Sequence, residues 1–95
     1  MAGVNTSKIT AKDATGLSLA DDSGTTHVTL EDGGNVGIGL TDPETKLHIQ
    51  NGSAGTIATT SGALLTLESN EKPKIHFQSP NAYGGSIIFG SVADN

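Results

Sequence analysis

The sequence predicts an all-β fold made of short strands and glycine-rich turns, and three observations support this prediction. Apolar residues alternate with polar or small ones in short runs, which places them on one face of a strand, and amphipathic helical spacing is nearly absent. Between the runs lie clusters of Gly, Asp, Asn, Ser and Pro, which supply the backbone angles of turns. From residue 17 to residue 49 the runs recur about every 8–11 residues, a rhythm typical of an all-β array.

The expected strands follow one another along the chain and are rich in Val, Ile and Thr, as strands prefer. They contain, in order, Leu17 and Leu19, Val28 and Leu30, Val36 and Ile38, Leu47 and Ile49, Leu65 and Leu67, Ile75 and Phe77, and the continuous apolar run 87–89. Turn residues separate these runs at 21–24, 32–35, 42–43, 51–52, 69–73, 79–81 and 84–85.

The same pattern predicts four segments. Residues 1–10 are polar and form a separate N-terminal segment, and residues 11–52 form a first β-repeat module. The stretch GSAGTIATTSG is compatible with a weak strand around Ile57 or with a flexible link, and we place a link at residues 53–62. Residues 63–95 form a second β module that is expected to continue in a longer chain.

The composition predicts that the fold depends on partner chains. Only 34% of the 95 residues are hydrophobic, 13 are glycine, and there is no cysteine to form a disulfide. Small chains with so little core usually gain stability from a metal, a disulfide or a partner. Each expected strand offers only two apolar side chains to a face, whereas three identical chains around an axis would join these into closed layers. The sequence therefore predicts a homotrimer with a core made of Leu17, Leu19, Val28, Leu30, Val36, Ile38, Leu47, Ile49, Leu65, Leu67, Ile75 and Phe77.

Charge and hydropathy argue against several classes of partner. The formal net charge is −5 and the sequence contains no arginine, whereas nucleic-acid binding needs a basic surface. The same acidity argues against an anionic membrane surface. No window approaches the roughly 18 apolar residues of a membrane span, and the first residues do not form a signal peptide. We expect neither nucleic acid nor a membrane as a partner.

The stretch GNVGIGLTDPETKLHI, residues 34–49, begins like a phosphate-binding glycine loop. Gly37 and Gly39 fit the first half of a dinucleotide fingerprint, but Asp42 stands where the third glycine belongs and no long helix is expected afterwards. A structural interpretation is favoured: glycines on either side of Ile38 let backbone pack closely against one side of a strand.

The remaining polar motifs also favour structural roles. Residues 41–44, Thr-Asp-Pro-Glu, match a capping box that could support at most one helical turn, with carboxylates serving the free N–H groups of the turn. No apolar surroundings would raise the pKa of Asp42 or Glu44 for acid–base catalysis. There is no cysteine nucleophile and no G-x-S-x-G motif. The sequence therefore predicts that the chain is not an enzyme and has no catalytic residue.

Metal and cofactor sites are not expected either. His27, His48 and His76 each sit out of phase with their apolar neighbours, so the period of two sends them to the solvated face of a strand. A histidine from each of three chains could meet on an axis, but these side chains are expected to point away from it. Residues 21–24, Asp-Asp-Ser-Gly, resemble the start of a calcium loop and lack its later ligands.

Three stretches together resemble a repeat found in bacteriophage tail fibres and tailspikes. The most specific is GNVGIG at 34–39, followed by Pro43 and KLHI at 46–49; Leu40 and Asp42 are mild departures from the usual pattern. Residues 13–17 through 31–34 resemble a common lead-in, and residues 75–80 through 88–90 resemble the segment that often follows. The resemblance covers residues 8–95.

The resemblance implies an intertwined homotrimeric fibre, similar to a β-prism or a triple β-helix, without enzymatic residues. The function it implies is that of a structural virion protein, assembled in the bacterial cytoplasm, which forms the shaft or the virion-proximal anchor of a tail fibre and supports host attachment. Residues 1–10 would then be an N-terminal docking segment, in which Val4, Asn5 and Ile9 contact another tail, neck or capsid protein. Two alternatives stay open: a capsid-decorating, collar or neck fibre protein, and a fragment of a glycan-binding or depolymerase tailspike, for which Tyr83 is the only expected aromatic platform.

Overall fold

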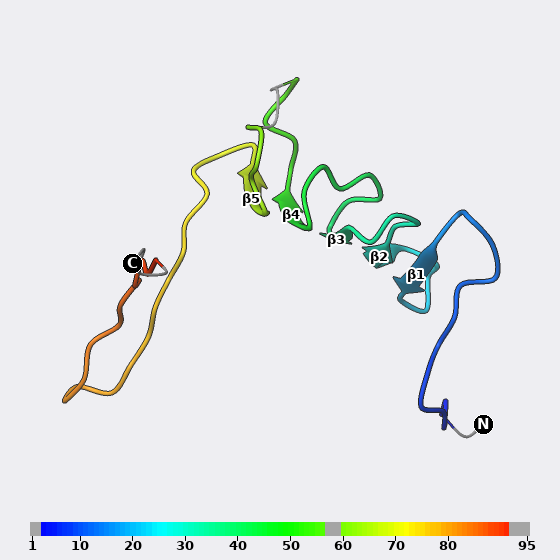
Figure 1. Ribbon diagram of the computed structural model, residues 1–95, viewed down its shortest axis with the longest axis horizontal. Coiled ribbons are helices and arrows are strands. Elements are labelled where there is room, and N and C mark those ends of the chain that lie inside the picture. Colours follow the sequence, from blue (N-terminus) through cyan, green and yellow to red (C-terminus); the bar gives the residue numbers. More distant parts are fainter. Residues whose placement is uncertain (1–2, 57–59, 92–95) are drawn as a thin grey trace.

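The computed structural model describes residues 3–56 and 60–91, and this part of the chain contains five strands, one sheet and no helix (Figure 1). The all-β prediction is confirmed, and so are five of the expected strands. The strands are β1 (Leu17–Ala20), β2 (Thr26–Leu30), β3 (Val36–Ile38), β4 (Leu47–Asn51) and β5 (Leu65–Ser69).

The strands lie side by side in the order of the sequence, β1-β2-β3-β4-β5. The first three strands are joined by two hairpins and pair antiparallel. Both hairpin turns use the same backbone closure: the N–H of Asp21 donates to the carbonyl of Thr25, and the N–H of Glu31 donates to the carbonyl of Asn35, each at 2.9 Å. The predicted turn residues therefore form the hairpins, because Asp, Asn, Ser and Gly accept these backbone angles.

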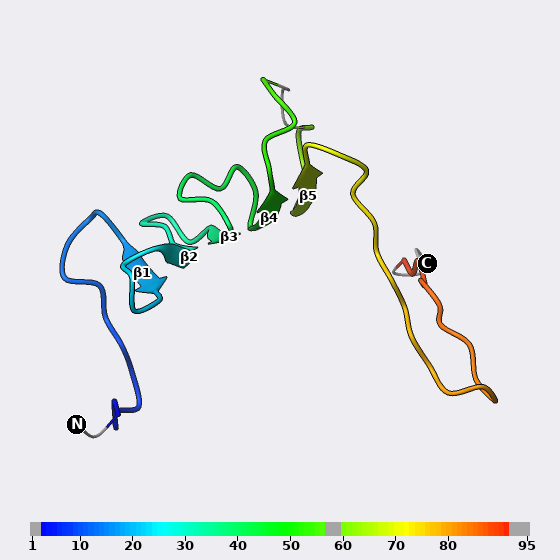
Figure 2. The same cartoon turned by 180° about the vertical axis from the view of Figure 1, so that it is seen from behind.

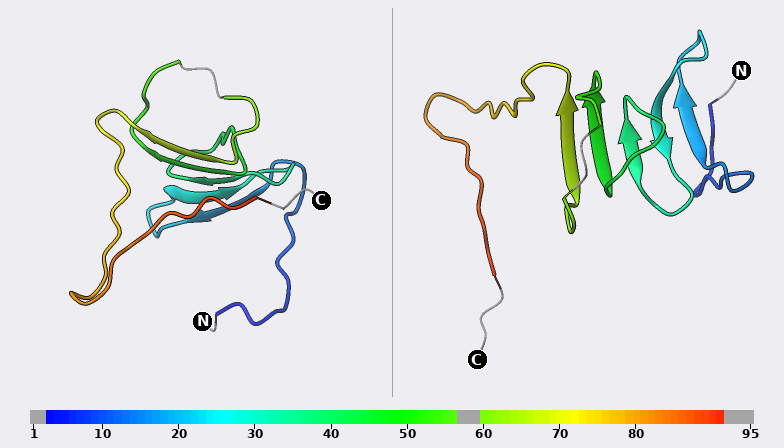
Figure 3. Two further views of the ribbon diagram at one scale, coloured as in Figure 1. Left: turned by 60° about the vertical axis from the view of Figure 1, so that its left-hand side comes forward. Right: turned by 90° about the horizontal axis from the view of Figure 1, so that it is seen from above.

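The second half of the sheet is parallel: β3 pairs with β4, and β4 pairs with β5. Each parallel pair needs a connection that carries the chain back across the sheet. The described residues of both connections, 39–46 in the first and 52–56 with 60–64 in the second, lie on the same face (Figure 3). The first crossover has only eight residues, fewer than the dozen usual for a parallel connection. Eight residues suffice because β3 is only three residues long, so the chain has only a short distance to return.

Gly37 lets the first crossover lie directly on the sheet, as the sequence predicts. A Cβ at this position would stand 2.7 Å from the carbonyl oxygen of Leu40 and 3.4 Å from Cβ of Pro43. Gly39 starts the return with a φ of 85°, which side chains other than glycine rarely adopt. The crossover contains bends and no helix, so the capping-box residues 41–44 form part of an irregular turn.

The register aligns the alternating residues into straight rows across all five strands. One row is Leu17, Leu30, Val36, Leu47 and Leu65, and a second is Leu19, Val28, Ile38, Ile49 and Leu67. The row between them is Ser18, Thr29, Gly37, His48 and Thr66, which points to the opposite face. We call the face with the two apolar rows the aliphatic face, and the face under the crossovers the polar face.

Residues 72–91, the C-terminal arm, leave the sheet in an extended path (Figures 1 and 2). The prediction of strands at Ile75–Phe77 and 87–89 is wrong for this chain alone, because neither half of the arm forms a backbone ladder with another described segment. The predicted turn near residue 80 is present: the N–H of Tyr83 donates to the carbonyl of Pro80 at 3.0 Å. The weak strand around Ile57 falls outside the described residues.

Candidate functional site

The burial of the two faces is the reverse of what an isolated soluble sheet requires. On the aliphatic face Leu19 is 53% exposed, Ile38 40% and Leu65 51%, and no hydrophobic residue in the described part of the chain is buried. On the polar face the crossovers cover Thr29 and His48, which is only 3% exposed. The chain thus buries the middle of its polar row, from Thr29 to His48, beneath its own loops and leaves its aliphatic rows partly exposed.

The aliphatic face is continuous, which separates it from the scattered apolar residues found on most surfaces. Ten of the twelve residues predicted for a trimer core lie in its two rows. The other two, Ile75 and Phe77, lie in the C-terminal arm and are 56% and 54% exposed. A surface with this many aligned aliphatic side chains gains free energy when it is removed from water, at about 25 cal/mol per Å² of apolar area.

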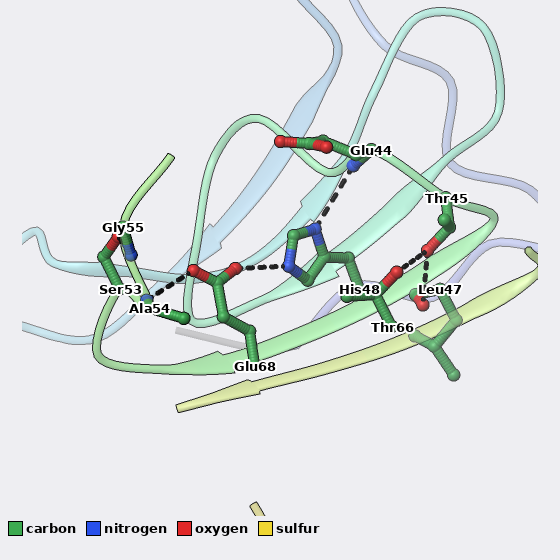
Figure 4. Close-up of polar contacts among 9 residues, drawn as sticks. All are labelled: Glu44, Thr45, Leu47, His48, Ser53, Ala54, Gly55, Thr66 and Glu68. Carbon is green, nitrogen blue, oxygen red and sulfur yellow. Dashed lines mark hydrogen bonds and ion pairs between the residues drawn. The ribbon is translucent and has the colours of Figure 1, made fainter. Parts of the chain in front are cut away.

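The polar face is closed by a network centred on His48 (Figure 4). Its Nε2 lies 2.7 Å from Oε1 of Glu68 on β5, and its Nδ1 accepts a hydrogen bond of 3.2 Å from the backbone N–H of Glu44 in the first crossover. The other carboxylate oxygen of Glu68 accepts from the N–H of Ala54 in the second crossover at 2.8 Å. One imidazole and one carboxylate therefore hold both crossovers against the sheet.

The hydrogen bonds of His48 fix its tautomer. Because Nδ1 accepts from a backbone N–H, the proton of the neutral ring sits on Nε2 and is donated to Glu68. The network extends the contact between β4 and β5 beyond the backbone ladder.

A second buried pair supports the same crossover. The hydroxyl of Thr45, which is 4% exposed, donates to the carbonyl of Leu47 at 3.0 Å and lies 2.9 Å from the hydroxyl of Thr66 (Figure 4). Thr66 is the next residue of the central row after His48, so hydroxyl groups continue the polar row beyond the imidazole ring. These contacts are structural, since each polar group is paired with another group of the fold.

The prediction that His48 lies on a solvated face is wrong, whereas His27 is exposed as predicted. Period-two alternation correctly sends His48 away from the aliphatic face, but the crossover covers that opposite face. A signal existed in the sequence: a connection of eight residues must lie flat on the neighbouring strand, and Gly37 provides the space. The carboxylates of the capping box do not serve the N–H of Glu44, which the ring of His48 binds instead.

Replacing His48 tests whether the network stabilises the fold. We expect His48→Ala to lower the free energy of unfolding by about 2 kcal/mol or more, because it leaves a cavity and removes the hydrogen bonds of the ring to Glu68 and to the N–H of Glu44. The matched control is His27→Ala, which removes an equally short contact of 2.7 Å to Asp21 at an exposed site, where such pairs contribute little. Urea unfolding followed by circular dichroism measures both, and equal effects of the two substitutions would contradict the role of burial.

The acid dependence of stability should report on Glu68. The N–H of Ala54, the side chain of Gln50 and the ring of His48 hold the pKa of Glu68 below its ordinary value of 4.5. A lowered folded-state pKa stabilises the fold fully above the unfolded-state value, and this contribution is lost as the pH falls through the folded-state pKa. We expect the urea midpoint to drop as the pH is lowered below about 4.5 and Glu68→Gln to flatten that drop; an unchanged slope would exclude this assignment.

Residues 21–24, which resemble the start of a calcium loop, form a hairpin turn whose polar groups bind one another. One carboxylate oxygen of Asp21 accepts from the N–H of Ser23 at 2.9 Å and of Thr25 at 3.1 Å, and the other contacts His27. The Ser23 hydroxyl and the His27 ring, together with these N–H groups, lower the pKa of Asp21 to about 2. Both oxygens therefore already serve the turn.

The other predicted positions lie apart from the two faces. Val4 is 76% exposed and Ile9 58%, and Asn5 is also exposed, in a segment that precedes β1 without joining the sheet. Within residues 3–56 and 60–91, no group of three His, Cys, Asp or Glu side chains could hold a metal ion. The same part of the chain contains no helix that is long and apolar enough to cross a membrane.

Comparison with known proteins gives no match: no protein-family model, no curated protein and no solved structure matches the chain.

Proposed function

We propose that the chain is a structural module of a virion fibre, in which three copies pack their aliphatic faces around a common axis. The observation that carries the proposal is the reversed burial of the sheet, with His48 3% exposed on one face and Ile38 40% exposed on the other. The described loops cover the middle of the polar row and leave the aliphatic rows exposed, which supports a core that other copies complete.

The two rows suit a rod rather than a globule. Rows at right angles to the strands run along the direction in which strands are stacked, with about 4.8 Å between neighbours. Three copies would therefore bring like side chains together in five successive layers per row, for example three Ile38 and three Ile49. Each layer is closed by symmetry, and the hydrogen-bonded polar face stays outside. The function is mechanical: a stiff, soluble connection.

Assignment to a phage fibre is supported by the resemblance of residues 34–49 to the fibre repeat. The structure adds a reason for that motif. GNVGIG supplies β3 and the two glycines that permit the short crossover, and KLHI supplies β4 with the buried histidine. The motif thus encodes one complete parallel turn of the sheet, which is the unit that a fibre would repeat.

The oligomeric state tests the core of the proposal. Analytical ultracentrifugation and light scattering of the purified chain should give three times the mass of the 9.6 kDa subunit. A folded chain that stays monomeric at high concentration would exclude a trimeric shaft. The aliphatic rows would then require a different partner.

The position of the chain in the virion tests the proposed assignment to a tail fibre. Labelling of the chain in intact virions by electron microscopy should place it at a tail fibre; a label on the capsid or collar would favour a decorating or neck protein instead. Deletion of residues 1–10, which contain the exposed Val4 and Ile9, should release the trimer from particles without dissociating it. Retained attachment would remove the docking role of this segment.

A further inference from the structure

One edge of the sheet is open and is bordered by a hollow on each face. β5 is the last strand of the sheet, and its outer edge has no strand beside it among the described residues. A hollow of about 510 Å³ on the polar side of β5 is lined by Ala54, Thr66 and Glu71, among others. A smaller hollow of about 210 Å³ on the aliphatic side is lined by Ile49, Leu67 and Pro73, among others. A strand added at this edge would place alternate side chains into the two hollows.

The C-terminal arm carries a segment that matches this edge. Ile75-His76-Phe77 repeats the apolar–histidine–apolar order of Leu47-His48-Ile49 on β4. If Ile75 lies opposite Leu65, the arm adds a sixth member to each aliphatic row. Ile75 and Phe77 are half exposed in the single chain, so their burial would be gained only on docking.

Charge favours the same register. His76 would then follow Thr66 in the central row, on the side where Glu68 and Glu71 carry negative charge. The opposite side of the edge is bordered by Lys72 and Lys74, away from the row that would receive the histidine. An imidazole beside carboxylates can donate a hydrogen bond to them.

The arm cannot reach this place in its own chain. A parallel strand must first return along the whole length of its neighbour, and only residues 70–74 separate β5 from Ile75. The six Cα–Cα steps from Ser69 to Ile75 span at most about 21 Å when fully extended. The return along β5 takes about 13 Å of this, and the rest is too short to rise over one face of the sheet and come down again. Pro73 restricts this connection further. The arm instead runs away from the sheet, on the side opposite to the crossovers (Figures 1 and 2).

We propose that residues 75–79 of one copy add to the β5 edge of a second copy as a parallel strand, with Ile75 opposite Leu65 and Ser79 opposite Ser69. The inference rests on the proposed trimer, because it requires the second copy to lie beside the arm. In a closed ring of three, each arm fills the edge of the next copy, so every β5 edge is covered.

Disulfide trapping tests this pairing, since the chain has no cysteine of its own. Ser69→Cys/Ser79→Cys replaces two serines that would lie directly opposite, at the strand spacing that a disulfide accepts. Thr66→Cys/His76→Cys probes the same register on the other face. The control, Ser18→Cys/Ser79→Cys, carries as many thiols but places one on β1, at the far edge of the sheet. Mild oxidation, non-reducing electrophoresis and mass spectrometry of mixed 14N- and 15N-labelled chains identify the linked residues.

We expect disulfides between chains in both test pairs, forming at least about tenfold faster than in the control because the trimer holds the thiols at high effective concentration. A disulfide within one chain, no disulfide in either test pair, or an equal rate in the control would overturn the docking. Light scattering of the same reduced samples distinguishes the proposed arm pairing from the proposed trimer. A trimer without the cross-link removes only the arm pairing, whereas a monomer removes the proposed fibre.

Discussion

Ile38→Asp should dissociate the proposed trimer while leaving the subunit folded. Ile38 occupies the middle of one aliphatic row, so three carboxylates would meet in a layer without water or partners. The loss of three buried isoleucines alone costs roughly 6 kcal/mol per trimer, at about 2 kcal/mol each, which weakens association roughly 10⁴-fold. The single chain tolerates the change because Ile38 is 40% exposed in it. Analytical ultracentrifugation at several concentrations measures the effect.

The matched control is Leu64→Asp. Leu64 is 69% exposed, precedes β5 and lies outside both aliphatic rows, so the same charge placed there should leave the mass of the assembly unchanged. If Ile38→Asp assembled as well as Leu64→Asp, the aliphatic face would not be the interface. If Ile38→Asp lost its circular dichroism signal as well as its trimer, the subunit would depend on assembly for folding.

Gly39→Ala should destabilise the fold by about 2–5 kcal/mol. Two costs add: a left-handed backbone costs a residue with a Cβ about 1–2 kcal/mol, and steric overlap in packed surroundings costs about 1–3 kcal/mol. Gly39 has a φ of 85°, and a Cβ there would overlap the backbone carbonyl oxygen of Gln50 on β4. Neither group can move without breaking the parallel pair, because both belong to the backbone. Thermal unfolding at one fixed chain concentration measures the loss.

Gly24→Ala separates the two costs. Gly24 has almost the same φ, 91°, but no atom lies within 4 Å of the position of a Cβ. It should therefore show only the backbone cost of about 1–2 kcal/mol. Equal losses at Gly24 and Gly39 would mean that the close approach between β3 and β4 contributes nothing to stability.

The strands could be predicted because their signal is local. Alternation over a few residues fixes which face each side chain takes, and the predicted pairs such as Val36 with Ile38 indeed share a face. Ile75 and Phe77 show the same alternation but form no strand, because a strand also needs a neighbour that supplies backbone hydrogen bonds. Local sequence does not contain that information, since the neighbour lies elsewhere in the chain or in another chain.

The burial of His48 is the second feature that the sequence alone did not predict. Alternation correctly assigns the ring to the face opposite Leu47 and Ile49, yet whether that face meets water depends on the path of the crossover. The partner of the ring, Glu68, lies twenty residues away on β5. Such a pair becomes visible only when the parallel register is known, because that register places Thr66 beside His48 and brings Glu68 within reach.

The order of strands in the sheet has a kinetic consequence. Every strand pairs with its neighbours in sequence. Of all the paired residues, those of β4 and β5 are the furthest apart along the chain. Local pairing of this kind lowers the entropy lost on loop closure and favours rapid folding, which can begin while the ribosome is still extending the chain. If the proposed fibre forms, encounter between finished subunits is then the slow step, and the yield of fibres depends on how many copies a cell holds at once.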